Sequence, residues 1–248
     1  MSRASRGFRI FGKAIKFLFF IFVFSVIFFL FWRIFSSDNP KSMERLAVND
    51  KLAAAYEQDG NDLYMFNQNL DMITRTEHNY GYFAVTNSVF IPAANQIQIT
   101  FRYNNSTITH LAEDKELSEV PSRDEDLFDV TLLLATDLTP ENTEDDLGND
   151  PDSVKLTRVH ASSVTAEKKN LYNYRRFVFD LDEIGVSLED LLESGELLAV
   201  YTDIYYVGDV NYEETTYGTL CIYDHLSGTH EVKLSGADKR ALRKYGKN

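Results

Sequence analysis

Cysteine is almost missing from this chain, which has only Cys221 in 248 residues. A single cysteine excludes a disulfide within the chain. A eukaryotic extracellular domain of this size would usually contain disulfides, so their absence favours a protein of the bacterial envelope.

The sequence also lacks the motifs of common catalytic and cofactor sites. It contains no HExxH or CxxC pair, no GxSxG, no P-loop and no GxGxxG. The five histidines therefore predict no zinc site, and we expect no resident cofactor. The one tryptophan, Trp32, lies in an apolar run, so the Cys–Trp–Cys core of antibody domains is absent as well.

Acidic residues are absent from positions 1–37, and all 38 of them follow. Six of the 25 basic residues precede or end the apolar run, which leaves 19 basic and 38 acidic residues after it, a formal charge of −19. A surface of this charge repels nucleic acid, so we expect no nucleic-acid partner.

One long apolar run is present. It extends from Phe17 to Trp32, and Ser25 is its only polar residue. Its sixteen residues span about 24 Å as a helix, and Ile34 and Phe35 extend the apolar character. We expect residues 17–35 to insert in the lipid bilayer as an uncleaved signal anchor. A cleaved signal peptide and a buried core helix are the alternatives, but no A-x-A cleavage site follows the run.

The basic residues before the run set the expected orientation. Five of them lie in residues 1–16, and the positive-inside rule then places this segment in the cytoplasm. We therefore expect a single-pass protein of the cell membrane, with a cytoplasmic N-terminus and an extracytoplasmic C-terminal domain.

Residues 36–80 are expected to form a linker and a helical neck, with a helix from about Pro40 to Glu57. Residues 235–248 form a basic C-terminal tail. It is expected to be helical over about 237–245, because Ser235 and Asp238 have the spacing of a capping box.

Residues 81–234 show the alternating pattern of half-buried strands, rich in β-branched and aromatic residues. The expected strands are 82–91, 96–103, 128–137, 154–160, 172–181, 196–206, 217–224 and 229–234. No long helix separates them, which disfavours parallel βαβ units. The fold class expected is mostly β, an antiparallel β-sandwich that is immunoglobulin-like in general shape, with short flanking helices.

The most polar segment, 137–153, is expected to be a long loop. Hard cations bind clusters of oxygen ligands, and four side chains around Gly148 could supply several of them for Ca²⁺. These are Asp146, Asn149, Asp150 and Asp152. A solvated loop without a metal is the alternative, because the spacing does not match an EF-hand.

A basic and aromatic stretch runs from Lys168 to Arg176 on this acidic chain. Stacking and charge-assisted hydrogen bonds predict a ligand or partner surface there, for a sugar or an anionic wall polymer. Its candidate residues are Tyr172, Tyr174, Arg175 and Arg176. The alternative is a strand that pairs with the acidic surface beside it.

The residues Thr219-Leu220-Cys221 resemble part of the TLxTC strand motif of the sortase transpeptidases. That resemblance implies a thiolate nucleophile at Cys221 and makes His160 the candidate acid. The two residues between Leu and Cys are missing, and no arginine lies between Cys221 and Arg240. We therefore interpret Cys221 as a structural strand residue whose side chain shares a face with Thr219 and Tyr223.

The function expected is non-enzymatic: a membrane-anchored extracytoplasmic binding or assembly subunit of a bacterial cell envelope. Its partner would be another envelope protein or a wall polymer. The alternatives are an envelope enzyme, either a sortase-like thiol transpeptidase or a hydrolase, and a carbohydrate- or wall-polymer-binding module.

Overall fold

The computed structural model describes residues 3–37, 41–68, 83–137, 154–169, 171–209 and 216–245. The chain divides into two compact units, which are described separately. One comprises Met1–Pro40 with Lys169–Leu171, and the other comprises Lys41–Lys168 with Tyr172–Asn248.

Helix α1 (Arg3–Ser37) contains the apolar run. Its part from Ile15 to Arg33 is 19 residues long and is apolar enough to cross a membrane. The described side chains in this part are all exposed. A membrane span and a signal sequence near the N-terminus share these properties, so the helix is compatible with either.

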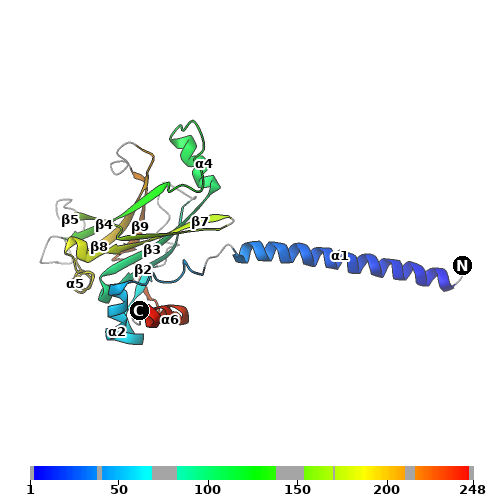
Figure 1. Cartoon of the computed structure of the whole chain (residues 1–248), viewed down its shortest axis with the longest axis horizontal. Coiled ribbons are helices and arrows are strands. Elements are labelled where there is room, and N and C mark those ends of the chain that lie inside the picture. The colour runs from blue at the N-terminus through cyan, green and yellow to red at the C-terminus, as the bar shows by residue number, and fades with distance from the viewer. Residues whose placement is uncertain are drawn as a thin grey trace. The chain divides into compact units, whose positions relative to one another are not determined.

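The larger unit is mostly β, with two antiparallel sheets in its described part (Figure 1). The six-stranded sheet has the order β10-β1-β2-β3-β7-β6, and the four-stranded sheet has the order β5-β4-β8-β9. The strands of the first sheet, in that order, are Thr229–Glu231, Phe66–Gln68, Ala84–Ile91, Gln96–Asn104, Tyr172–Asp180 and Ser163–Lys168. Those of the second are Val154–His160, Phe128–Asp137, Leu197–Tyr206 and Thr216–Asp224.

Short helices connect and cover these strands. The α-helices are α2 (Asp50–Asp59), α4 (Asn105–Asp114), α5 (Leu188–Glu193) and α6 (Gly236–Tyr245). The 3₁₀ turns are η1 (Gly60–Asp62), η2 (Pro92–Ala94) and η4 (Leu181–Ile184). Ser187 caps α5 by accepting a hydrogen bond from the Asp190 N–H. Ser235 and Asp238 bond reciprocally at the start of α6, which confirms the predicted capping box.

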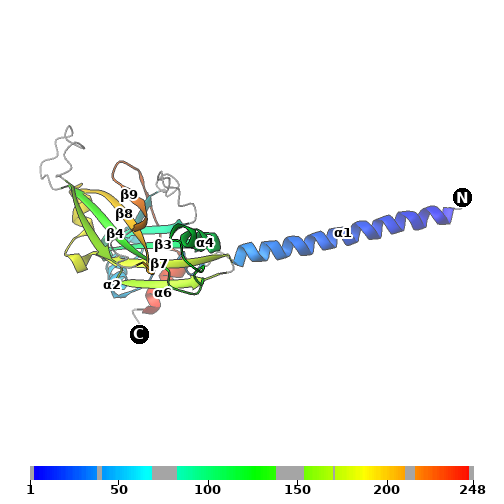
Figure 2. The same cartoon turned by 90° about the horizontal axis from the view of Figure 1, so that it is seen from above.

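The main hydrophobic core lies between the two sheets, whose strands run in different directions where they overlap in Figure 2. The six-stranded sheet contributes Phe90, Ile97 and Ile99, which are fully buried. The four-stranded sheet contributes Leu132, Leu134 and Val200 from its facing side. The alternation of these core residues along β3 and β4 is the pattern seen in the sequence.

A second cluster covers the other face of the six-stranded sheet. Val89 and Ile91 of β2 pack there against Leu52 of α2 and Leu242 of α6. Figure 1 shows α2 and α6 on that side of β2 and β3. Residues 41–49, here called the strap, contribute Leu46 to the same cluster. The six-stranded sheet is therefore buried on both faces over much of β2 and β3.

The strap differs from the helix expected from about Pro40, because α2 begins only at Asp50. Asn49 has extended backbone angles and caps α2 by accepting the Leu52 N–H at 2.9 Å. Before it, the strap backbone bonds to β3 side chains instead of to itself: Met43 O accepts from Thr100 Oγ1 at 3.2 Å. Tertiary hydrogen bonds have replaced the first turns of the predicted helix.

Three further elements differ from the pattern in the sequence. Strand β6 is exposed along most of its length, so it lacks the alternation that marks a half-buried strand. Helix α4 follows β3 directly, because Asn104 and Thr107 form a capping box at its start. Strand β1 lies within the range expected for the neck and pairs with both β2 and β10.

Candidate functional site

The predicted calcium ligands Asp146, Asn149, Asp150 and Asp152 lie outside the described residues. Within the described ranges, no group of three or more His, Cys, Asp or Glu side chains is placed to hold a metal ion. The calcium site stays a prediction.

Strand β7 divides the predicted aromatic and basic surface between its two sides. In register, Tyr172, Tyr174 and Arg176 lie opposite Asn104, Arg102 and Thr100 of β3, on the side that the strap covers. Arg175 lies on the other side with Phe177 of the core. The structure therefore does not bring the four residues together into one surface.

Arg175 fastens the loop that precedes β4. Its guanidinium forms an ion pair with Asp126 and donates to Phe128 O at 3.2 Å. The neighbouring Asn173 donates to Arg123 O at 3.0 Å and accepts from Arg123 Nε at 2.9 Å. The guanidinium of Arg175 is thus directed at the loop inside the domain and is buried there.

Arg176 fastens the strap. Its guanidinium donates to Ser42 O at 3.2 Å and to Arg45 O at 2.7 Å. Burial lowers the pKa of Arg176, while the nearby carboxylates of Asp238 and Glu167 act in the opposite direction. Its charge is thus held beneath the strap and is not presented to a ligand.

Of the four candidate residues, Tyr172 and Arg176 are half-exposed, and Tyr172 pairs with the half-exposed Arg102 of β3. The Arg102 guanidinium lies 4.6 Å from the centre of the Tyr172 ring, in a cation–π contact. Tyr174 packs edge-on against Tyr172 and is buried. Of the four candidate residues, Tyr172 therefore presents an aromatic ring to solvent, whereas the half-exposed Arg176 is bonded to the strap.

Cys221 is half-buried on β9, and its Sγ donates to Tyr223 O at 3.2 Å. Burial raises the pKa of the thiol, which disfavours the nucleophilic thiolate. Strands β4 and β8 separate β9 from β5, which carries His160, so the two backbones are about 14 Å apart. The sheet thus keeps the candidate acid out of reach of the thiol.

Tyr223 does not share the face of Cys221, contrary to the sequence-based expectation. It joins the core with Leu220 and Ile222. Strand β8 pairs Val200 with Tyr223 and Tyr201 with Cys221, so Ile222 has no partner and the register shifts. This β-bulge turns Tyr223 inward, and a strict period of two cannot predict it.

A buried polar network occupies the outer face of the four-stranded sheet. The Asp203 carboxylate, only 4% exposed, accepts from Thr219 Oγ1 at 2.6 Å and from the Tyr205 hydroxyl at 3.3 Å. Thr131 lies opposite Asp203 in register, and its hydroxyl is 3.4 Å from that of Tyr205. The sequence spacing of Asp203 and Tyr205 puts them on one face of β8 but gives no sign that they are buried.

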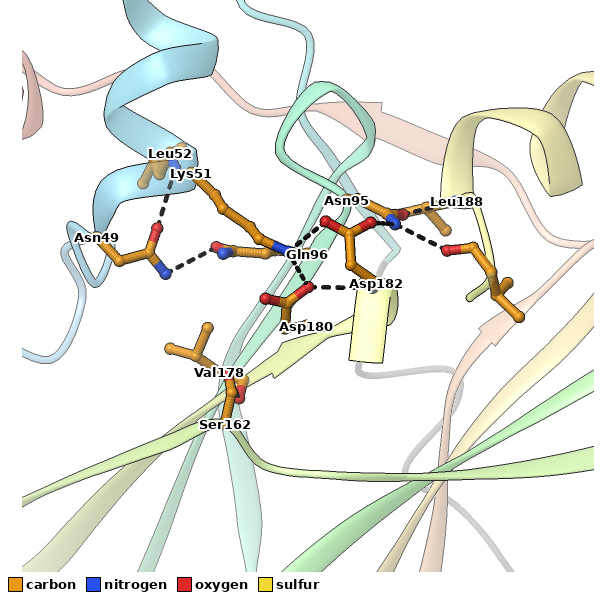
Figure 3. A network of polar contacts seen from close by, with 11 residues as sticks. Asn49, Lys51, Leu52, Asn95, Gln96, Ser162, Val178, Asp180, Asp182 and Leu188 are labelled. Carbon is orange, nitrogen blue, oxygen red and sulfur yellow. Dashed lines mark hydrogen bonds and ion pairs between the residues drawn. The ribbon is translucent and has the colours of Figure 1, made fainter. Parts of the chain in front are cut away.

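A second polar network joins α2, the β2–β3 turn and the end of β7 (Figure 3). Lys51 Nζ contacts Asp180 at 2.5 Å and also pairs with Asp182. Asn95, in left-handed backbone geometry, donates to Val186 O at 2.7 Å and accepts from the Leu188 N–H at 2.8 Å. These groups satisfy one another, so the network acts as a structural joint.

Hydrogen bonds from Lys51 and Asn95 lower the pKa of Asp182. Burial alone would lower the pKa of Lys51, but its hydrogen bonds to Asp180 and Asp182 raise it above its ordinary value.

Exposed apolar side chains gather on two consecutive edge strands. Strand β5 is the edge of the four-stranded sheet and β6 is the edge of the six-stranded sheet. Leu156 and Val154 on β5 are 61% and 39% exposed, and Val164 on β6 is 49% exposed. Within the described ranges, β5 pairs only with β4, and β6 pairs only with β7. Leu156 lies opposite Ala135, on the face of its sheet away from the core, whereas Val164 lies opposite Phe177 on the core side of the other sheet. We call these two open strand edges together the β5–β6 edge.

An open edge strand presents backbone N–H and C=O groups that another strand can pair with. The apolar side chains of the β5–β6 edge would add buried area to such a pairing. Among the described residues, this is the arrangement best suited to binding a macromolecule.

Comparison with known proteins finds no family model, no curated protein and no solved structure that matches this chain.

Proposed function

We propose that this chain is a membrane-anchored assembly subunit of the bacterial envelope that binds a partner protein at the β5–β6 edge. The observation that carries the proposal is the exposure of Leu156 and its neighbours on a strand with one open side. Monomeric proteins usually block an open edge strand with charged residues, proline, a bulge or a covering segment. An apolar open edge is instead typical of a site that a partner strand covers.

The anchoring part of the proposal is supported by α1, which is long and apolar enough to span a bilayer. The basic flank before the run supports an orientation with the N-terminus in the cytoplasm and the β unit outside. The low cysteine content supports a bacterial source.

A thiol enzyme is not proposed, because the Cys221 thiol has a raised pKa and the sheet separates it from His160. The immunoglobulin-like shape is kept as a proposal about general form. Its support is the pair of antiparallel sheets around one core.

The chain offers a matched pair of residues for the test. Leu156 lies on the proposed edge, whereas Leu226 is 80% exposed in the turn that follows β9. A photo-crosslinking amino acid at position 156 should trap a discrete partner in intact cells, and the same group at position 226 should not. Equal labelling at both positions, or none at position 156, would refute the assignment of the edge.

A further inference from the structure

Helix α6 carries four cationic side chains on one side. At about 100° per residue, Arg240, Arg243 and Lys244 lie on the arc opposite Asp238 and Leu242, and Lys239 flanks this arc. Asp238 and Leu242 are buried, whereas Arg240, Arg243 and Lys244 are exposed and Lys239 is half-exposed. We call these four side chains the cationic face of α6.

The cationic face has no anionic partner within the described part of the chain. The described ion pairs join other residues, including Lys51, Lys115, Lys168 and Arg175. The chain after the apolar run has a formal charge of −19, so carboxylates are abundant. Four neighbouring cations on such a chain form a local site of opposite sign.

The helix is held firmly, so its cationic face has a fixed direction. The Leu46 N–H donates to Asp238 Oδ1 at 3.1 Å, which fastens the first turn of α6 to the strap. The Tyr245 hydroxyl donates to Asp50 Oδ1 at 3.2 Å at the last turn. Leu242 packs in the same cluster as Leu52. These contacts occupy the opposite side of the helix and leave the cations outward.

The position of this helix along the chain favours a membrane surface as the occupant. Leu46 follows Ser37, the last residue of α1, by nine residues. A chain of that length reaches at most about 30 Å. If α1 spans the bilayer, this short connection limits how far the strap, and the α6 turn bonded to it, can lie from the membrane surface.

We infer that the cationic face of α6 binds anionic phospholipid headgroups of the membrane in which α1 is anchored. The inference rests on the anchoring in the proposed function but not on the β5–β6 edge. Each Lys or Arg at an anionic surface strengthens binding by about fivefold. The same surface repels the acidic remainder, so the contact favours one orientation of the β unit.

The test uses the full chain in nanodiscs that hold one copy each. A fluorophore is attached at Ala241→Cys in a Cys221→Ala background, since Ala241 is exposed on α6. Lipids with a headgroup quencher report its proximity to the surface. We expect strong quenching with phosphatidylglycerol and weak quenching with phosphatidylcholine alone. This difference between the two lipids should disappear when the salt concentration is raised from about 0.1 M to about 1 M.

The variants separate local charge from total charge. R240Q/R243Q should lower the equilibrium constant for the surface-bound state by roughly 25-fold, at about fivefold per cation. K155Q/K168Q removes the same charge from β5 and β6 and should leave quenching unchanged. Equal thermal melting of both variants shows that they fold, and the salt titration of the parent provides a second test that needs no variant.

Three outcomes would overturn the inference. In the first, quenching is the same with anionic and zwitterionic lipids. In the second, both variants change quenching equally. In the third, quenching appears only when two copies share a disc. The last would assign the cationic face to the acidic surface of a second copy. A chain that fails to enter nanodiscs at all would overturn the anchoring itself, and the crosslinking at Leu156 would remain a separate test of the edge.

Discussion

The Gln98 side chain holds Ala47 by both of its backbone groups. The Ala47 N–H donates to Gln98 Oε1 at 2.7 Å, and Gln98 Nε2 donates to Ala47 O at 3.0 Å. The amide thus gives the strap the pair of bonds that a neighbouring strand would give. Thr100 bonds to Met43, and Gln96 bonds to Asn49, on either side of it.

Gln98→Leu should therefore destabilise the domain. The change leaves the Ala47 N–H and C=O without partners in a part-buried position, at a cost of about 1–3 kcal/mol for each unpaired group. The free energy of unfolding of the full chain in detergent, from a urea titration, measures the loss. Gln58→Leu on the exposed side of α2 is the control and should change stability by less than about 0.5 kcal/mol. Equal effects of the two changes would contradict the role given to Gln98.

Arg175→Met should loosen the loop before β4. The change removes the contact with Asp126 and the hydrogen bond to Phe128 O. Because Arg175 is buried, we expect a loss of about 2 kcal/mol and faster hydrogen exchange in residues 120–128. Arg45→Met, at an exposed side chain in the strap, is the matched control. Unchanged exchange in the loop would show that Arg175 does not hold it.

The joint around Lys51 predicts a pH dependence of stability. The pKa of Asp182 is lowered in the folded chain, so its contribution is present above the ordinary aspartate pKa and is lost as pH falls through the lowered value. Lys51→Met should flatten the acid side of the melting-temperature profile. Lys155→Met, on β5, keeps the Asp182 pairing and should leave the profile unchanged. A parent profile with no slope in this range would contradict the predicted linkage.

Cys221 should behave as a structural thiol. Because burial raises its pKa, alkylation should be slow at neutral pH and should speed up only well above the ordinary thiol pKa. The linked contribution to stability is present below the unfolded pKa and is lost as pH rises through the folded value. Cys221→Ala should cost about 1 kcal/mol. Fast labelling at neutral pH would instead indicate an activated nucleophile.

The apolar run should stay attached to the mature chain. No A-x-A site follows it, and α1 continues to Ser37 without a break. Intact-mass measurement of the membrane fraction should give a protein that retains residues 17–35. A mature N-terminus near Ser36 would show that the run is a cleaved signal sequence.

Alternation predicted most strands well, because a side chain that enters the core recurs every second residue. The ranges 128–137 and 154–160 agree with β4 and β5. Strand β6 was missed because its side chains are mostly exposed, so hydrophobicity does not mark it. The joint at Lys51 could not be predicted either, since Asp180 and Asp182 come from a part of the chain about 130 residues away.

The predicted ligand surface shows a second limit of prediction from the sequence. Composition correctly identified a run of cations and aromatic rings on β7, but the alternation that defines a strand also sends neighbours to opposite sides. Arg175 and Arg176 are adjacent in sequence, yet one binds the loop before β4 and the other binds the strap. Adjacent charges on a strand thus serve separate partners.

The strap also determines how the domain would respond to mechanical force. Tension on the chain at Lys41 would reach the β unit first through the bonds of Arg176 on β7 to Ser42 O and Arg45 O. It would then reach the bonds to Thr100, Gln98 and Gln96 on β3. Strand β3 lies inside the six-stranded sheet, with β2 and β7 on either side. A pull would therefore load the middle of the sheet through several bonds in parallel, and would not peel a strand from its edge.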